Sequence, residues 1–283
     1  MSPSVIRPVW AVFALGLGWS TVQAAPDPSS VRTGLHLGLE HFRWEELGAS
    51  PANRQLLEET GPRVTAAVTV DNLERISEGG LFAFKLRGSY GQVDYDGETQ
   101  DGVPLQTESE YLAAGAEART GFRFPLRWSS LAIDPMVGAG VDWWSRDIQG
   151  GTDEIGRRVG GLEETYRVIY AKAGLGLTEL NHDEWTGRLE AGGKYPLDIH
   201  EEVSAYSASL EPGRDVSLYA QYQVTRTTET AKYALTVYYE TYRFESSPLV
   251  QTGKDLDGDG NNDIIRQPQS DMDRIGVRLG WFL

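Results

Sequence analysis

Apolar and polar residues alternate with a period of two along most of the chain, and helical periodicity is scarce. In the segment 63–70, for example, Val64 and Val68 lie on one face, and Arg63 and Thr65 lie on the other. This period places successive side chains on opposite faces of a β-strand. About ten such series occur, and they predict strands near 34–45, 63–70, 82–90, 112–122, 131–143, 169–177, 185–195, 216–224, 233–240 and 274–283.

The polar faces of these strands distinguish a membrane barrel from a soluble β-sandwich. They combine charges of both signs with many Gly and Tyr residues. Side chains of this kind fill the interior of a narrow transmembrane barrel, whereas the exposed face of a sandwich can be any polar mixture. We therefore expect an interior plugged by paired charges, which include Glu40, Lys85, Arg87, Glu117, Arg119, Asp134, Asp142, Lys172, Arg188, Glu190, Lys194, Glu240, Arg274 and Arg278.

The lengths of the connections give an independent test. If the N-terminus is periplasmic, the short connections, such as 125–129, 179–184 and 226–230, are periplasmic turns. Long extracellular loops that alternate with short periplasmic turns are typical of outer-membrane barrels, and a soluble sandwich has no reason to follow this rule. The expected long loops are 45–61, 94–108, 147–163, 197–213 and 247–270.

Aromatic residues recur at the spacing of a bilayer. Trp185 and Tyr195 share the apolar face of one predicted strand, ten residues apart. At about 3.3 Å per residue and a tilt near 40°, they are separated by roughly 25 Å along the membrane normal, which is the height of the apolar band of such barrels. Similar positions are expected for Trp143, Tyr90 and Tyr239 at the outer girdle and for Trp281, Phe122 and Tyr222 near the inner one.

The chain resembles the bacterial outer-membrane β-barrel proteins over nearly its whole length. The segment from Arg274 to Leu283 alternates like their last strand, which usually closes on an aromatic residue; here Phe282 precedes the final Leu283. The resemblance implies an all-β fold, an antiparallel transmembrane β-barrel of about ten strands. It also implies a monomeric barrel of the Gram-negative outer membrane, with outer-membrane lipid as its partner.

Composition excludes several other classes of protein. The 26 basic and 41 acidic side chains give a formal net charge of −15, and no cluster of Lys or Arg is present. We therefore expect no binding to nucleic acid, whose phosphates this charge would repel. No stretch approaches the roughly 18 apolar residues of a transmembrane helix. The chain has 0 Cys, which excludes disulfides, thiolate catalysis and Cys-ligated zinc.

Residues 1–24 have the features of a secretory signal peptide. Arg7 supplies a positive charge, residues 9–18 form a short apolar core, and residues 22–24, Val-Gln-Ala, form a small-residue cleavage site. We expect the mature chain to begin at Ala25, so that residues 25–283 form one barrel domain. Glycines at 16 and 18 argue against the alternative, a buried N-terminal helix.

One acidic segment in the last long loop has the spacing of a calcium site. It resembles the Asp-rich loops of EF-hand-like and thrombospondin-like repeats, with Gly260 at position 6 for the tight turn. Position 12, where an EF-hand supplies a bidentate Glu, is Arg266, so we expect weak binding of Ca²⁺. The alternative is a solvated acidic loop. The expected ligands are Asp255, Asp257, Asp259, Asn261 and Asp263.

Two other short motifs resemble those of the omptin proteases, which are ten-stranded barrels. These are Asp94 with Asp96, and Asp198 with His200, and both pairs are expected at extracellular loops. In omptins, His and Asp activate a water molecule and the Asp pair positions it. The alternative is that acidic loops hold such pairs by accident, and no other omptin-like stretch is present.

The sequence therefore predicts an outer-membrane barrel of structural or surface-interaction type, with a largely plugged lumen and a calcium-binding extracellular loop. No catalytic residue is assigned on this interpretation. A narrow, porin-like solute channel and an omptin-like surface protease are the two alternatives.

Overall fold

The computed structural model describes residues 31–48, 54–99, 102–180, 184–254 and 262–283. The regular secondary structure of these residues consists of strands. None of the described segments is a helix long and apolar enough to cross a lipid bilayer.

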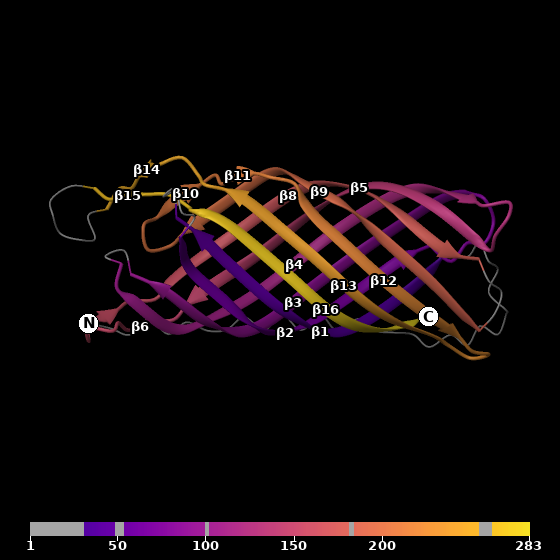
Figure 1. The fold of residues 1–283 in the computed structure, drawn as a ribbon, viewed down its shortest axis with the longest axis horizontal. Helices are drawn as coiled ribbons and strands as arrows, with labels where there is room; N and C mark the ends of the chain where they lie inside the picture. The colour runs from indigo at the N-terminus through magenta and orange to yellow at the C-terminus, as the bar shows by residue number, and fades with distance from the viewer. Residues whose placement is uncertain (1–30, 49–53, 100–101, 181–183, 255–261) are drawn as a thin grey trace.

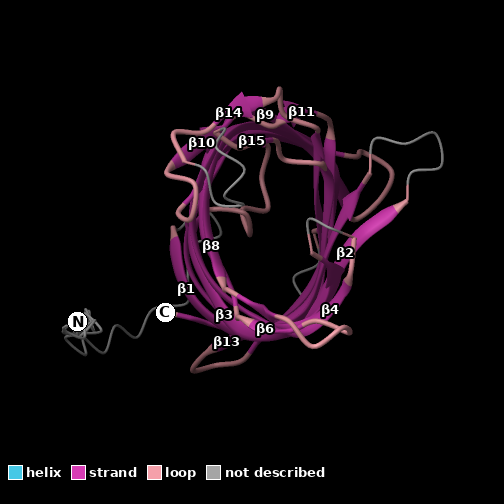
Figure 2. Cartoon of the chain, turned by 90° about the vertical axis from the view of Figure 1, so that its left-hand side faces the viewer, coloured by secondary structure: helices cyan, strands magenta, loops and turns pink. Residues whose placement is uncertain are grey.

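Ten long strands close into one antiparallel barrel. Consecutive strands are hydrogen-bonded neighbours, and the last strand pairs with the first over 14 residue pairs, from Gly34 opposite Phe282 to Leu47 opposite Gln269. Figure 2 shows the strands as a closed ring. Closure leaves no open sheet edge, so the backbone polar groups are satisfied within the wall. The strands are β1 (Arg32–Leu47), β2 (Gln55–Asp71), β3 (Gly79–Glu98), β4 (Pro104–Pro125), β5 (Leu131–Ile148), β8 (Leu162–Glu179), β9 (Trp185–Val203), β12 (Ser217–Thr227), β13 (Lys232–Glu245) and β16 (Gln269–Phe282).

The two ends of the barrel differ, as the lengths of the connections predict. One end carries the short turns together with the C-terminus, and the other carries the longer connections, at the left of Figure 1. We call the second end the outer end. Short strands in its connections are β6 (Gly151–Thr152), β7 (Arg158–Val159), β10 (Ala208–Leu210), β11 (Gly213–Arg214), β14 (Val250–Gln251) and β15 (Ile264–Ile265).

The strands are longer than the apolar alternation predicts, and several expected loops are therefore largely strand. β3 continues to Glu98 and β4 begins at Pro104, so most of the expected loop 94–108 belongs to the wall, and Asp198 and His200 lie inside β9. Alternation continues beyond the apolar band with polar side chains on the outside. The wall therefore extends past the bilayer at the outer end.

A band of exposed apolar side chains surrounds the wall. Leu37, Val137 and Leu279 are 71%, 58% and 67% exposed, as expected for contact with lipid. The aromatic residues expected at the girdles are also exposed, among them Trp185 at 53% and Tyr195 at 48%. Together, the closed barrel and this band confirm the predicted fold class.

Candidate functional site

The inward face of the wall is filled with charged side chains. Every charged residue that the alternation places inward is buried or partly buried. Eleven of them form a mid-barrel belt of mutually interacting groups: Glu40, Arg63, Lys85, Arg87, Glu117, Asp142, Lys172, Lys194, Glu240, Arg274 and Arg278.

Carboxylates of the belt bridge cations from different strands. Glu240 accepts hydrogen bonds from Arg87 at 2.5 Å and from Arg274 at 2.8 Å. The Lys172 ammonium donates to both oxygens of Glu117, at 3.1 and 3.0 Å. Arg87 on β3 and Glu240 on β13 are four strands apart around the ring, so their contact crosses the lumen. Arg274 is the neighbour of Glu240 on the adjacent strand, and Lys172 lies two strands from Glu117.

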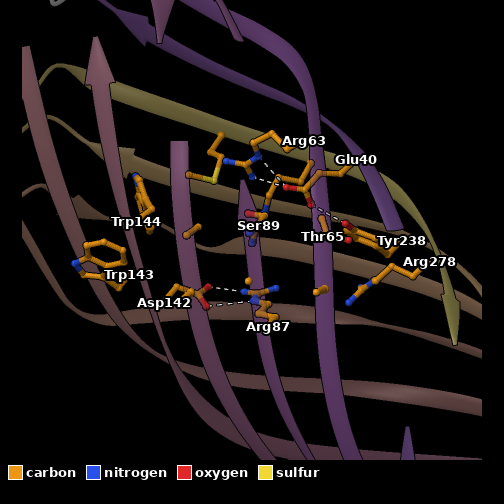
Figure 3. Close-up of a pocket in the computed structure, with 16 residues that line it drawn as sticks. Glu40, Arg63, Thr65, Arg87, Ser89, Asp142, Trp143, Trp144, Tyr238 and Arg278 are labelled. Atoms are coloured by element: carbon orange, nitrogen blue, oxygen red, sulfur yellow. Dashed lines mark hydrogen bonds and ion pairs between the residues drawn. The ribbon is translucent and has the colours of Figure 1, made fainter. Parts of the chain in front are cut away.

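Figure 3 shows the part of the belt that surrounds a small cavity. Arg63 donates to Glu40 at 2.9 and 2.5 Å, and the Tyr238 hydroxyl donates to the other oxygen of Glu40 at 2.6 Å. Arg87 donates to both oxygens of Asp142. The cavity has a volume of about 30 Å³, which is room for about two water molecules.

The belt holds more cations than anions. Seven Lys and Arg side chains face four carboxylates, and Lys85, Lys194 and Arg278 form no ion pair with any described residue. Two of these three cations lie over aromatic rings instead. Lys194 Nζ is 3.9 Å from the centroid of Tyr242, and the guanidinium carbon of Arg278 is 3.9 Å from that of Tyr238. Cation–π contact compensates part of the cost of burying these charges.

A second group of buried charges closes the periplasmic end. Arg123 and Asp134 are fully buried and form a two-pronged pair, with N–O distances of 2.8 and 2.6 Å. Arg188 also donates to Asp134, and the Thr178 hydroxyl donates to it at 2.7 Å. A bidentate, fully hydrogen-bonded pair is the arrangement in which burial of two charges is best compensated.

Five charged residues form an outer-rim cluster, which lies beyond the apolar band: Glu46, Glu59, Arg146, Glu164 and Glu201. Arg146 donates to Glu59 at 3.0 Å, to Glu46 at 2.9 Å and to Glu164 at 2.8 Å. It is the one cation among four carboxylates in this described cluster. The outer rim therefore has an excess of negative charge, in contrast to the belt.

Glu201 is the exceptional member of this cluster. It is 0% exposed, and neither of its carboxylate oxygens has a hydrogen-bond partner of normal geometry among the described residues, although the Tyr166 hydroxyl lies close enough to stabilise the carboxylate weakly. The neighbouring Tyr166 hydroxyl donates instead to Glu164 at 3.0 Å. Burial, together with the nearby Glu164 and Glu46 carboxylates, raises the pKa of Glu201 well above its ordinary value. The side chain therefore favours its neutral form.

Aromatic side chains pack across the lumen beside the outer-rim cluster. Trp144 stacks on Tyr166 with ring centroids 5.0 Å apart, and Tyr242 stacks on Phe244 at 5.5 Å. Trp44 contacts the same group at 6.1 Å from Phe244. We call these five residues the aromatic plug. They come from β1, β5, β8 and β13, so the plug spans the barrel rather than lining one side of it.

The structure does not bring the two omptin-like pairs together. Asp94 and Asp96 alternate with buried Val93 and Tyr95 on β3, so their side chains point away from the lumen. β3 and β9 are separated by β4, β5 and β8 along the shorter path around the barrel. The Asp pair and the Asp–His pair therefore lie on the outside of different parts of the wall.

A bulge turns Asp198 and His200 outward. The register between β8 and β9 shifts at Ile169 and Tyr170, which leaves one extra residue in β9, and Ile199 and Glu201 become the buried positions. Asp198 then pairs with Arg167 on the outer surface at 3.1 Å. His200 lies near Glu202 and Ser209, at 3.3 and 3.2 Å. This geometry holds none of the four residues over a common substrate position.

The expected calcium ligands fall mostly outside the described residues. Asp255, Asp257, Asp259 and Asn261 belong to the undescribed segment 255–261, and only Asp263 lies within the described part. The Asp263 amide donates to the Lys254 carbonyl at 2.8 Å, and its carbonyl accepts from the Thr252 amide at 2.8 Å. Elsewhere in the described chain, no group of three or more His, Asp or Glu side chains is arranged to hold a metal ion.

Comparison with known proteins identifies the fold. No family model and no curated protein sequence matches the chain. The outer membrane protease OmpT from Escherichia coli shares 10% identity at a TM-score of 0.56, over 90% of this chain and 96% of that one. The translocator domain of the autotransporter NalP from Neisseria meningitidis shares 12% identity at a TM-score of 0.39, over 87% of this chain and 88% of that one.

The TM-score of 0.56 with OmpT shows a shared architecture, and an identity of 10% says nothing about activity. The architecture agrees with the closed ring of strands, the exposed apolar band and the contrast between the two ends. The chain therefore has the fold of the bacterial outer-membrane β-barrel proteins, and its apolar band fits it to an outer membrane.

Proposed function

We propose that this protein is a closed outer-membrane barrel that serves as a rigid support for contacts at the cell surface. The observation that carries the proposal is the filling of the lumen. Three successive groups of side chains, at the periplasmic end, in the belt and in the aromatic plug, meet across it, and the belt cavity of about 30 Å³ has room for only about two water molecules. A solute channel would need a continuous opening.

The outer end supports a role in surface contacts. The wall continues beyond the apolar band, and the connections there carry the paired short strands β6 with β7 and β14 with β15. A closed, ion-paired wall fixes where these connections emerge. Loops held by a rigid scaffold are the usual carriers of binding function.

Bilayer recording tests the closed lumen directly. We expect refolded protein to show no steady conductance. Since the three groups close the lumen in series, Trp144→Ala with Tyr166→Ala should still show no steady conductance, and conductance events should appear only when Arg87→Ala in the belt and Arg123→Ala at the periplasmic end are added. Trp128→Ala is the matched control, since Trp128 is 84% exposed in a periplasmic turn. A large steady conductance in the unaltered protein would favour the channel instead.

The protease alternative has a separate test. We expect the purified protein to leave a mixed peptide library intact, because Asp94 and Asp96 lie far around the wall from Asp198 and His200. Cleavage that is lost in both Asp96→Asn and His200→Gln would contradict this expectation.

We also propose that the segment from Asp255 to Asp263 binds Ca²⁺ weakly. Support comes from the Asp and Gly spacing and from the two hydrogen bonds that join Asp263 to Thr252 and Lys254, which close the base of the loop. Calcium should protect the bonds after Lys254 and Arg266 from trypsin. Asp257→Ala with Asp259→Ala should abolish that protection, and equal cleavage with calcium and with chelator would contradict the proposal.

Export, lipid contact and the monomeric state complete the proposal. The signal peptide, residues 1–24, lies outside the described residues, and its support is the charge and apolar pattern of the sequence. N-terminal sequencing of protein from an outer-membrane fraction should give Ala25 as the first residue. Light scattering in detergent should give the mass of one chain, and a soluble periplasmic protein would contradict the assignment.

A further inference from the structure

The cavity in the mid-barrel belt has an unusual lining. Four guanidinium groups, those of Arg63, Arg87, Arg274 and Arg278, border it together with two carboxylates, those of Glu40 and Asp142. All six side chains come from the lumen-facing side of the wall, and Figure 3 shows five of them around the cavity. The lining therefore carries an excess of positive charge inside a nearly closed, low-dielectric space, where such an excess is costly.

The carboxylates of the lining are already engaged by other donors and leave little capacity for the excess cations. Glu40 accepts two hydrogen bonds from Arg63 and one from Tyr238. Asp142 accepts from Arg87 through both oxygens and from the Tyr242 hydroxyl. Arg278 is left with no carboxylate partner among the described residues, although it is only 8% exposed.

Several donors at the cavity are buried and unpartnered. The Thr65 hydroxyl and the Nε atoms of Arg274 and Arg278 have no hydrogen-bond partner among the described residues. Buried donors of this kind usually have a partner, so each one indicates an unassigned acceptor. A water molecule would supply acceptor capacity, but it would leave the excess positive charge of the lining uncompensated. A monatomic anion accepts from all sides and donates nothing.

We propose that this cavity binds a single chloride ion. The volume of about 30 Å³ has room for a small ion together with about one water molecule, and favours a small anion over a larger one. Chloride neutralises the excess charge of the lining and accepts hydrogen bonds from Thr65, Arg274 and Arg278. It acts as a structural ion that completes the belt, and this role is independent of whether the outer end contacts a partner.

Bromide replaces chloride chemically and can be located by its anomalous scattering. Crystals grown in sodium bromide should show one anomalous peak inside the cavity, next to the Arg278 guanidinium. In parallel, the heating midpoint of the barrel, followed by its gel mobility, should rise with the logarithm of chloride concentration. At equal ionic strength it should rise much less with isethionate, because this larger organic anion fits the cavity less well than chloride.

Matched variants assign the effect to the cavity. Arg278→Gln should abolish the chloride dependence of the midpoint, and the nearly isosteric Thr65→Val should reduce chloride affinity several-fold even if the Arg variant fails to fold. Arg226→Gln removes the same charge from an exposed pair with Glu184 and should leave the chloride dependence unchanged. Equal midpoints in chloride and isethionate, or a cavity without anomalous signal, would overturn the proposal. A peak at crystal concentrations without any chloride dependence in solution would overturn it as well.

Discussion

The outer-rim cluster and the mid-barrel belt lie in the same lumen but carry opposite excesses of charge. In the rim, one guanidinium serves four carboxylates, and Glu201 has no hydrogen-bond partner of normal geometry among the described residues. In the belt, seven cations serve four carboxylates, and Lys85, Lys194 and Arg278 have no ion pair there. In each region, the scarce charge, which is the one of the minority sign, pairs with several charges of the other sign. We therefore expect the scarce charges, the Arg146 cation in the rim and the carboxylates in the belt, to contribute most to stability, and the unpaired surplus charges of the majority sign to contribute least.

The rim and the belt also differ in how they accommodate their surplus charges inside the barrel. The rim is the region outside the bilayer, where a surplus carboxylate can hold a proton taken from water. The belt lies at the level of the apolar band, where the surplus cations lie against aromatic rings or the cavity. Substitutions that remove scarce or surplus charges separate these two cases.

The largest effect is expected from removing the scarce charge of the rim. Arg146→Met leaves Glu46, Glu59 and Glu164 buried without their shared cation, so the free energy of unfolding should fall by about 4 kcal/mol. Urea unfolding of the refolded barrel in detergent micelles measures the loss. Arg43→Gln is the control, because the Arg43 side chain is 40% exposed and its ion pairs are at the surface. We expect this variant to lose about 1 kcal/mol or less of its free energy of unfolding. Similar losses in both variants would mean that the rim is wet.

The scarce charge of the belt comes next. Glu240→Gln keeps the shape of the side chain but removes the carboxylate that Arg87 and Arg274 share. We expect a loss of about 3 kcal/mol, which is smaller than for Arg146 because Arg87 keeps its pair with Asp142. If the variant unfolds at the urea concentration of the unaltered protein, the belt is not held by its carboxylates.

The sequence predicts the belt better than the rim, because the alternation of apolar and polar residues is clear only within the apolar band. Within the apolar band, each outward Leu or Val identifies its inward neighbour, and this places Glu40, Lys85 and Glu240 correctly. Beyond the band the outward residues are polar, and the inward face mixes aromatic with charged side chains, so hydropathy alone does not mark Glu46, Glu59 and Arg146 as inward. Extending the alternation of β5 from outward Trp143 would have placed Trp144 and Arg146 inward.

The same extension fails in β9. Counting from inward Lys194 by twos places Asp198 and His200 inward and Glu201 outward, and the bulge near Leu197 reverses all three. A single inserted residue changes the phase of everything that follows it. Its position depends on the pairing with β8, which no pattern within β9 reveals. The protease-like pair Asp198 and His200 therefore lies in the part of β9 where the sequence alone does not determine which side chains face the lumen.

A smaller effect, of opposite sign, is expected from the surplus carboxylate of the rim. Glu201→Gln replaces a buried carboxyl with a neutral side chain, and the free energy of unfolding at pH 7 should rise by about 1 kcal/mol. Since the pKa of Glu201 is raised in the folded state, the unfolded chain releases its proton first as the pH increases. Stability should therefore fall as the pH rises from the ordinary value of 4.5 towards the raised one, and then level off. The Gln variant should show a flatter pH profile, and identical profiles would mean that Glu201 has a partner.

The smallest effect is expected from a surplus cation of the belt, and the barrel contains a matched control for it. Lys172 and Lys194 lie opposite each other on β8 and β9, and both are buried. Lys172 pairs with Glu117, whereas Lys194 contacts the Tyr242 ring without an ion pair among the described residues. Lys172→Met should therefore cost about 2 kcal/mol, since Glu117 keeps its ion pair with Arg119 at 3.0 Å. Lys194→Met should change the free energy of unfolding by less than about 1 kcal/mol, because the loss of cation–π contact is offset by the relief of an unpaired buried charge. Urea unfolding of both variants under the same conditions decides the point. Equal losses would show that pairing does not distinguish the two lysines, and the contrast between scarce and surplus charges would then fail inside the belt itself.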